Sequence, residues 1–189
     1  MGLHEQSVGA SDEWYTPPHV FEAMGVTFDM DVSSPGHNVV PWIPAKRHIS
    51  STFDGLAMTW DGFVWMNPPF GGRNGLVPWL DRFFTHGDGV ALVPDRTSAP
   101  WWQRFSPRAS RVLFVAEKLK FLTPDPVLGS RKNKDGTRTP QPSQFPGLFL
   151  GSQPAQGTTL MAVGERGAAA LEAAERAGLG LNFERRAAA

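Results

Sequence analysis

Short apolar runs alternate along this chain with segments of helical periodicity, and this alternation constrains the fold more than any other feature. The runs 63–66, 90–93 and 111–116 are too short for helices and predict buried strands. Segment 74–85 lies between two of them and repeats its apolar side chains at helical spacing. Strands that alternate with helices in this way are typical of α/β folds with a mostly parallel central sheet.

The remaining elements are predicted from shorter signals. A helix is expected through Phe21 and Met24, with Thr16 as its N-cap and Pro17 at its first position, and a second helix is expected after a cap at Ser98. Segment 33–51 is expected to be a long loop with at most one short element. Further strands are expected at 26–32, 145–150 and 158–163, the last two as a closing antiparallel hairpin.

Length and composition indicate one domain without covalent or metal cross-links. The 189 residues carry a formal net charge of zero, so binding to phosphates must come from local patches. Cysteine is absent, and the five histidines lack metal-ligand spacing, so no metal is expected. No apolar stretch approaches the ~20 residues of a membrane span, and the N-terminus lacks a signal-peptide pattern. We therefore expect a cytoplasmic protein with no membrane contact.

The chain is expected to divide into a main unit and weaker flanking segments. We expect a flexible leader at 1–11, the α/β domain at 12–165 and an Ala-rich helix and tail at 166–189. Within the domain, 124–144 is a Pro- and Gly-rich excursion whose Arg131, Lys132, Lys134 and Arg138 outnumber Asp125 and Asp135. Such an excursion is either an ordinary solvated loop or a contact for nucleic acid.

The apolar run 63–66 ends in Asn67-Pro68-Pro69-Phe70, which is the strongest chemical signal in the chain. Pro69 has no N–H, so the Pro68 carbonyl is an acceptor with no donor beside it. The Asn67 amide supplies a second acceptor, and Phe70 adds a flat apolar face. Two acceptors above an aromatic ring suit a planar group that bears an NH₂, such as adenine. The alternative is a turn in which the two prolines only stop the strand.

For three other polar residues, the sequence allows two alternative roles each. Asp31 is expected to end a strand at the ligand-binding edge of the sheet, where it contacts a cofactor or caps a loop. Asp54 precedes Gly55 and either holds a ribose or adenine or forms a plain turn. Arg96 follows a strand and either contacts phosphate or pairs with Asp95. Trp101 and Trp102 are expected to lie in the core rather than to stack on bases.

An ordered series of motifs makes the chain resemble the phage-type Dam family of DNA N6-adenine methyltransferases. The series includes Trp14-Tyr15-Thr16-Pro17 near the N-terminus and Asn67-Pro68-Pro69-Phe70 at the centre. In full it comprises 12–17, 28–32, 54–56 with Trp60, 64–71, 92–97, 101–102, 111–115, 119–121 and 145–146. It covers most of the main domain, and the ordered set is far more specific than the central tetrapeptide alone.

The resemblance implies a Rossmann-like methyltransferase domain that uses S-adenosylmethionine to methylate a flipped-out adenine in double-stranded DNA. It also implies a role in restriction–modification or regulation in a phage or its host, in the host cytoplasm if the gene is phage-encoded. Carried over by position, the catalytic residues are Asn67, Pro68, Pro69 and Phe70. The cofactor-binding residues are Trp14, Tyr15, Thr16, Pro17, Asp31, Ser33, Asp54 and Asn67. The DNA-binding residues are Arg96, Arg131, Lys132, Lys134 and Arg138.

The chain departs from many methyltransferases at one point. Asp31 is followed by Val32-Ser33-Ser34-Pro35 rather than by a glycine-rich turn. Ser33 and Ser34 are small enough to allow close approach of a ligand. The alternatives to DNA adenine methylation are methylation of another amine or amide, in RNA adenine or protein glutamine, and a catalytically degenerate member that binds DNA or cofactor without turnover.

Overall fold

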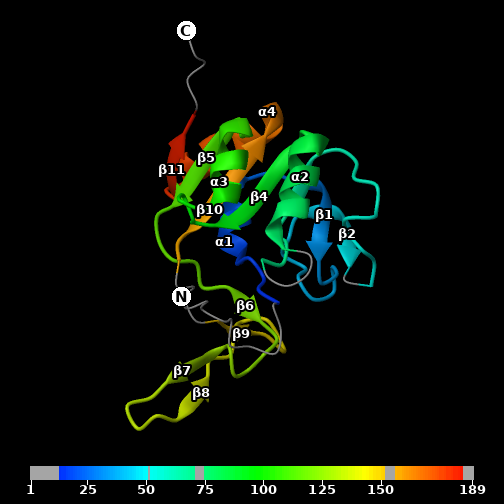
Figure 1. Cartoon of the computed structure of the whole chain (residues 1–189). Helices are drawn as coiled ribbons and strands as arrows, with labels where there is room; N and C mark the ends of the chain where they lie inside the picture. Colours follow the sequence, from blue (N-terminus) through cyan, green and yellow to red (C-terminus); the bar gives the residue numbers. More distant parts are fainter. Residues whose placement is uncertain (1–12, 51, 71–74, 152–155, 185–189) are drawn as a thin grey trace.

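A seven-stranded mixed sheet forms the centre of the computed structural model, which describes residues 13–50, 52–70, 75–151 and 156–184 (Figure 1). The strand order is β11-β5-β10-β4-β3-β1-β2. The strands are β1 (Phe28–Ser34), β2 (Ala45–Ser50), β3 (Val64–Met66), β4 (Gly89–Pro94), β5 (Arg111–Val115), β10 (Thr158–Val163) and β11 (Gly180–Phe183). The helices within the described residues are α1 (Pro18–Met24), α2 (Leu76–His86), α3 (Pro100–Phe105), the 3₁₀ helix η1 (Ser106–Arg108) and α4 (Gly164–Arg176).

Most strands of the sheet run in one direction. β2, β1, β3 and β4 pair in parallel, and α2 forms the crossover from β3 to β4. β5 has the same direction as β4, because both are antiparallel to β10, which lies between them. β11 is antiparallel to β5 at one edge. The prediction of an α/β fold with a mostly parallel sheet and flanking helices is therefore confirmed.

Alternating side chains of the strands build a core on each face of the sheet. In β4, Val90 and Leu92 pack in a cluster with α1 and α4, while Ala91 and Val93 pack in a second cluster with α2 and α3. Trp102 is buried in the second cluster and Trp101 is half-buried against it, in line with the prediction that both belong to the core. The result is a sheet covered by helices on both faces.

The predicted closing hairpin is wrong. Thr158–Val163 forms β10 as predicted, but it inserts between β4 and β5. Residues 149–150 form β9 (Phe149–Leu150), which pairs with β6 (Leu122–Thr123) in a separate two-stranded sheet. Local patterning predicts that both segments are extended, but it does not determine their partners. All residues of β10 are buried, so the strand shows no alternation of buried and exposed residues that would indicate its neighbours.

Two edge strands went unpredicted within segments expected to be loop or tail. β2 lies at the end of the supposed loop, and its Lys46 and Arg47 are exposed, which hides the apolar alternation of a strand. β11 follows the Ala-rich helix and exposes Leu181 and Phe183. Strand β1 also extends past the predicted end at Val32 to Ser34, with a register irregularity between Asp31 and Ser34. The expected leader 1–11 lies outside the described residues.

The predicted helix caps at Thr16 and Ser98 are also wrong. Helices α1 and α3 begin one residue after Pro17 and Ala99, and neither N-cap residue makes a side-chain cap bond. In both cases a proline occupies the first turn, where its fixed φ and missing N–H suit the helix start. The hydroxyl of Thr16 is therefore available for a different contact.

The excursion 124–144 contains a β-hairpin that projects away from the central sheet (Figure 1). Its strands are β7 (Ser130–Lys132) and β8 (Arg138–Pro140). Asn133 Nδ2 donates to Thr137 Oγ1 at 2.9 Å, and Gly136 turns the chain with φ of +88°. The hairpin is thus an ordered arm rather than an unstructured loop.

Candidate functional site

Asn67 lies directly after β3, at the centre of the parallel half of the sheet between β1 and β4. The carboxyl ends of β1, β3 and β4 meet at one edge because these strands are parallel. In open α/β sheets, ligands bind in the crevice outside this edge. The short buried run of β3 therefore places Asn67 where a substrate can reach it.

Hydrogen bonds hold both the backbone and the side chain of Asn67. Its backbone N–H donates to Ser33 Oγ at 3.0 Å. Its side-chain Nδ2 donates to the Trp14 carbonyl at 2.8 Å and lies 3.3 Å from Thr16 Oγ1. Three residues predicted to bind the cofactor thus contact Asn67 itself. None of the described residues donates to Asn67 Oδ1.

The other three residues of the tetrapeptide differ in burial. Pro68 is buried, Pro69 is exposed, and the Phe70 ring is 39% exposed. Within the described part of the chain, no hydrogen bond uses the Pro68 carbonyl. The tetrapeptide therefore combines two acceptor oxygens without partners among the described residues and an accessible aromatic ring.

The segment 14–17 connects this edge with the base of the excursion. Tyr15 forms a reciprocal pair of backbone hydrogen bonds with Leu122 of β6, at 2.8 and 2.9 Å. The Tyr15 ring is buried, and its hydroxyl lies 3.2 Å from Glu13 Oε2. Burial and the nearby carboxylate raise the pKa of the Tyr15 hydroxyl. Trp42 Nε1 donates to the Thr16 carbonyl at 2.9 Å, and Pro17 is buried at the start of α1.

Asp31 lies within β1 rather than at its end, which corrects the predicted position. Its side chain is 2% exposed, and Oδ1 accepts a hydrogen bond from the Ser33 backbone N–H at 3.3 Å. Its Oδ2 lies 3.5 Å from Nδ1 of His48 in β2, and the same Nδ1 lies 3.0 Å from Ser34 Oγ. His48 Nε2 is buried and has no partner among the described residues.

Sequence reasoning missed His48 because it lies in the unpredicted strand β2. The signal that could have found it is the alternation of polar and apolar residues at the end of that strand. Its ring is 7% exposed, so a polar atom of the imidazole is desolvated next to a buried carboxylate. A buried imidazole nitrogen without a hydrogen-bond partner costs free energy, unless a further polar group binds it.

Asp54 forms a turn, which is one of the two alternatives predicted for it. Its Oδ1 accepts a hydrogen bond from the Leu56 N–H at 2.9 Å, and its side chain is exposed. The following Gly55 lies against the end of β1, where an added Cβ would be 2.3 Å from the Val32 carbonyl oxygen. Arg82 of α2 donates to the carbonyls of Leu56 and Met58 and holds the turn from the other side.

The predicted DNA-binding residues lie at two places. Arg96 is exposed just after β4, and its Nε donates to Gln156 Oε1 at 2.6 Å; no ion pair with Asp95 occurs in the described structure. The other four are exposed on the projecting hairpin, where Arg138 donates to Ser130 Oγ at 3.2 Å. They are Arg131, Lys132, Lys134 and Arg138.

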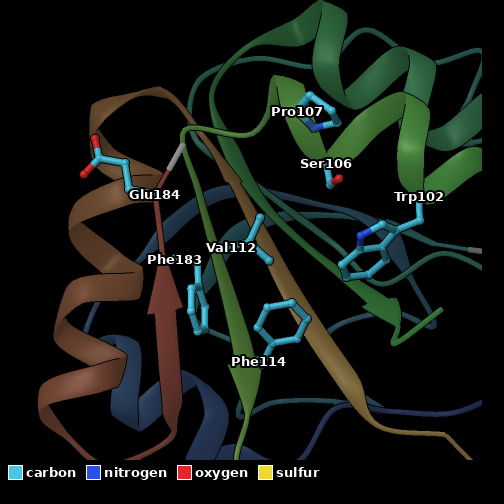
Figure 2. A pocket seen from close by; sticks show the side chains of 7 residues that line it. All are labelled: Trp102, Ser106, Pro107, Val112, Phe114, Phe183 and Glu184. Carbon is cyan, nitrogen blue, oxygen red and sulfur yellow. The ribbon is translucent and has the colours of Figure 1, made fainter. Parts of the chain in front are cut away.

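A shallow hollow of about 420 Å³ lies elsewhere, where η1 and α3 face β5 and β11 (Figure 2). Trp102, Phe114 and Phe183 form its aromatic wall, and the predicted site residues do not line it. In the described part of the chain, no cluster of three or more His, Asp or Glu side chains is arranged to hold a metal ion. None of the described helices combines the length and the apolar character that a membrane span needs.

The model of the family described as DNA N-6-adenine-methyltransferase (Dam) matches residues 5–141, which is well over half of the chain. The match includes the tetrapeptide, the segment 14–17, β1 to β5 and the projecting hairpin. No curated protein and no solved structure matches the chain.

Proposed function

Because the chain belongs to the Dam family of DNA N-6-adenine-methyltransferases, we propose that it transfers a methyl group from S-adenosylmethionine to N6 of an adenine flipped out of duplex DNA. The observation that carries this proposal is the arrangement at the end of β3. There, Asn67 Oδ1 and the Pro68 carbonyl have no partner among the described residues, beside the accessible ring of Phe70.

The two acceptors suit the adenine amino group. This nitrogen is a poor nucleophile because its lone pair is delocalised into the ring. Hydrogen bonds from its two N–H groups to Asn67 Oδ1 and the Pro68 carbonyl favour a more tetrahedral nitrogen whose lone pair is available. Both acceptors are neutral, so they do not take the surplus proton of the methylated amine, which leaves to water.

Phe70 is the proposed platform for the target base. Adenine in a duplex is inaccessible, and its extrusion costs a few kcal/mol in lost stacking. Stacking on an aromatic side chain recovers about 1–3 kcal/mol per base. The 39% exposure of Phe70, directly after the acceptors, supports this role.

Residues in β1, in β2 and in the turn after β2 suit the proposed donor. S-adenosylmethionine, when bound, supplies a methyl group on a positively charged sulfonium centre. The buried Asp31 carboxylate is an acceptor for a cationic amine, and the unpartnered His48 Nε2 is an orphaned polar atom that a ligand group can satisfy. Ser33 and Ser34 provide small side chains where many methyltransferases have a glycine-rich turn. Asp54 keeps one carboxylate oxygen outside its turn bond and is proposed to contact the ribose.

We assign DNA contacts to Arg96 and to the projecting hairpin. The hairpin carries Arg131, Lys132, Lys134 and Arg138 against Asp135, and all five side chains are exposed. A two-stranded ribbon fits the major groove of duplex DNA, and cations on it neutralise phosphates. Arg96 lies after β4, near the same edge as Asn67, and is proposed to contact a phosphate close to the target.

The deciding experiment incubates the protein with S-adenosylmethionine and mixed-sequence duplex DNA and then identifies methylated nucleosides by mass spectrometry. We expect N6-methyladenine from the wild type and a loss of at least about 100-fold in rate for Asn67→Ala, the scale seen when a transition-state hydrogen bond is removed. The matched control is Asn38→Ala, since Asn38 is exposed in a loop and is expected to leave the rate unchanged.

Parallel reactions with RNA and with protein extract test the other acceptors. Methyl transfer to RNA adenine or protein glutamine, and none to DNA, would contradict the proposed substrate. A calorimetric titration with S-adenosylmethionine, read together with the methylation assay, tests the degenerate alternative. Methylation of DNA excludes that alternative, whereas cofactor binding without methylation of any acceptor supports it and overturns the proposal.

A further inference from the structure

We propose that Thr16 is a positioning residue that, together with the Trp14 carbonyl and Ser33, restricts Asn67 to the role of hydrogen-bond acceptor. We call these three groups the Asn67 clamp. The inference deepens the proposed function and rests on it, because it explains which chemical groups the catalytic amide can bind. It also gives Thr16 and Ser33 a role other than the predicted contact with the cofactor.

The clamp occupies every N–H donor of Asn67. An asparagine has one backbone N–H and two side-chain N–H groups. Ser33 Oγ takes the first at 3.0 Å, and the Trp14 carbonyl and Thr16 Oγ1 take the other two at 2.8 and 3.3 Å. Asn67 therefore has acceptor oxygens, and no unused donor, to present to a substrate.

The orientation of the amide follows from its partners. A backbone carbonyl such as that of Trp14 can only accept a hydrogen bond. If the amide were flipped, its oxygen would face the Trp14 oxygen at the 2.8 Å that now separates Nδ2 from it. The clamp thus fixes Nδ2 toward the segment 14–16 and Oδ1 toward the opposite side, away from it.

The clamp is itself held in place from several directions. Thr16 is 1% exposed, and its carbonyl accepts a hydrogen bond from Trp42 Nε1 at 2.9 Å. Tyr15, between the two clamp residues of this segment, is bound on both its N–H and its C=O to Leu122. The Trp14 ring packs against Gly151, where a Cβ would lie 2.5 Å from it. These contacts preorganise the amide before a substrate arrives.

An acceptor-only amide discriminates between bases by their exocyclic groups. The amino groups of adenine and cytosine can donate to Asn67 Oδ1. The O6 of guanine and the O4 of thymine are acceptors and would meet an unpaired oxygen. The clamp therefore favours adenine or cytosine, which carry an amino group where guanine and thymine carry an oxygen, and it does so without a charged residue.

The test compares Thr16→Val, which removes the hydroxyl but keeps the shape, with Thr16→Ser, which keeps the hydroxyl. At saturating DNA and S-adenosylmethionine, Thr16→Val is expected to lower kcat roughly tenfold, the scale of one lost hydrogen bond. Thr16→Ser is expected to recover most of that loss. The Kd for S-adenosylmethionine, measured by calorimetry, is expected to stay the same in both variants. Thr59→Val, at an exposed position, is the matched control.

A double mutant that combines Thr16→Val with Asn67→Ala separates a positioning role of Thr16 from a general structural effect. If Thr16 acts through Asn67, Thr16→Val will cause no further loss of kcat in the Asn67→Ala background. An independent readout is the side-chain amide signal of Asn67 in an NMR spectrum, assigned by its absence in Asn67→Ala. We expect slow hydrogen exchange of this amide in the wild type and in Thr16→Ser, and faster exchange in Thr16→Val.

The outcomes distinguish the clamp from the proposed function. An active wild type with an unchanged kcat in Thr16→Val, or with a weakened Kd for S-adenosylmethionine as the main effect, overturns the clamp and leaves the function standing. An inactive wild type overturns the proposed function. The amide exchange still tests the clamp in that case, since equal exchange in all three proteins refutes it and faster exchange in Thr16→Val supports it.

Discussion

Single residues at this site are constrained by how closely backbone segments approach one another. Gly55 lies where the turn after β2 touches the end of β1, and Tyr15 lies where the segment 14–17 touches β6. Neither contact involves a proposed catalytic residue directly. Both fix the position of neighbours with a proposed role at the site, namely Asp54 in the first case and Trp14 and Thr16 in the second.

Gly55→Ala is expected to destabilise the protein. The added Cβ would lie 2.3 Å from the Val32 carbonyl oxygen and 2.7 Å from the Trp79 ring, and a backbone oxygen cannot move aside by rotating a side chain. We expect a loss at the upper end of the about 1–3 kcal/mol typical of overpacking, measured by urea unfolding. The comparison is Gly147→Ala, which has open space and a φ of +76°, so that only backbone strain of about 1 kcal/mol applies. Equal losses would contradict this explanation.

Tyr15 offers a spectroscopic report on the segment 14–17, because it is the one tyrosine of the chain. Burial and the Glu13 carboxylate raise its pKa, so the folded state binds this proton more tightly than the unfolded state does. The resulting stabilisation is complete below the ordinary tyrosine pKa and is lost as the pH rises above it. We expect phenolate absorbance to appear only together with alkaline unfolding, followed by circular dichroism. Ionisation near pH 10 in folded protein would show that the ring is not buried.

At the scale of elements, the projecting hairpin and the two edge strands of the sheet lie outside the repeating strand–helix pattern. The β7–β8 hairpin projects from the body (Figure 1). Its base reaches the candidate site through β9, β6 and Tyr15. The edge strands differ in character: β2 exposes Lys46 and Arg47, whereas β11 exposes Leu181 and Phe183. Charged residues on an edge oppose pairing with other chains, so β2 is protected in this way.

The proposed role of the hairpin predicts a change in salt dependence. If Arg131 contacts a phosphate, Arg131→Gln will reduce the slope of log K against log salt for DNA binding by about 1. Arg176→Gln removes another exposed cation, from the end of α4 and far along the chain from the hairpin, and serves as the control. Fluorescence anisotropy with labelled duplex DNA at several salt concentrations gives both slopes. Identical slopes for the two variants would remove the hairpin from the proposed interface.

At the scale of the whole molecule, an ionic network joins α4 to the amino end of the sheet. Arg166 of α4 binds Asp88 and lies 3.3 Å from Asp29 of β1, which also pairs with Lys46 of β2 at 2.8 Å. Asp29 Oδ2 accepts the Phe63 N–H at 2.8 Å as well. The network therefore lies at the edge of the sheet opposite to the candidate site. There it connects elements that are far apart in sequence.

Because of this network, we expect the free energy of unfolding to fall in acid as Asp29 becomes protonated. The hydrogen bond from Lys46, then that from the Phe63 N–H, lowers the pKa of Asp29 from 3.8 to about 2. Since the folded-state pKa is depressed, the contribution of Asp29 is complete above pH 4 and is lost as the pH falls toward 2. Urea unfolding between pH 4 and pH 2 should show a shallower decline for Asp29→Asn than for the wild type. Asp61→Asn, at a more exposed carboxylate, is expected to follow the wild type.

The sequence by itself determined the elements whose signals are local. The apolar runs of β3, β4, β5 and β10, the helical period of α2 and the prolines after Asn67 each depend on neighbouring residues, so they could be read from the chain. The tetrapeptide and the accompanying motifs also indicated the family, which the match over residues 5–141 confirms.

Only the tertiary structure decided the partners. The insertion of β10 between β4 and β5, the pairing of β6 with β9 and the edge strands β2 and β11 depend on contacts between distant segments, which local pattern does not encode. The same holds for the site: His48 beside Asp31 and the contacts of Trp14, Thr16 and Ser33 with Asn67 join residues from separate elements. A hydrogen bond is set by position and orientation in space, and folding alone brings these groups within reach.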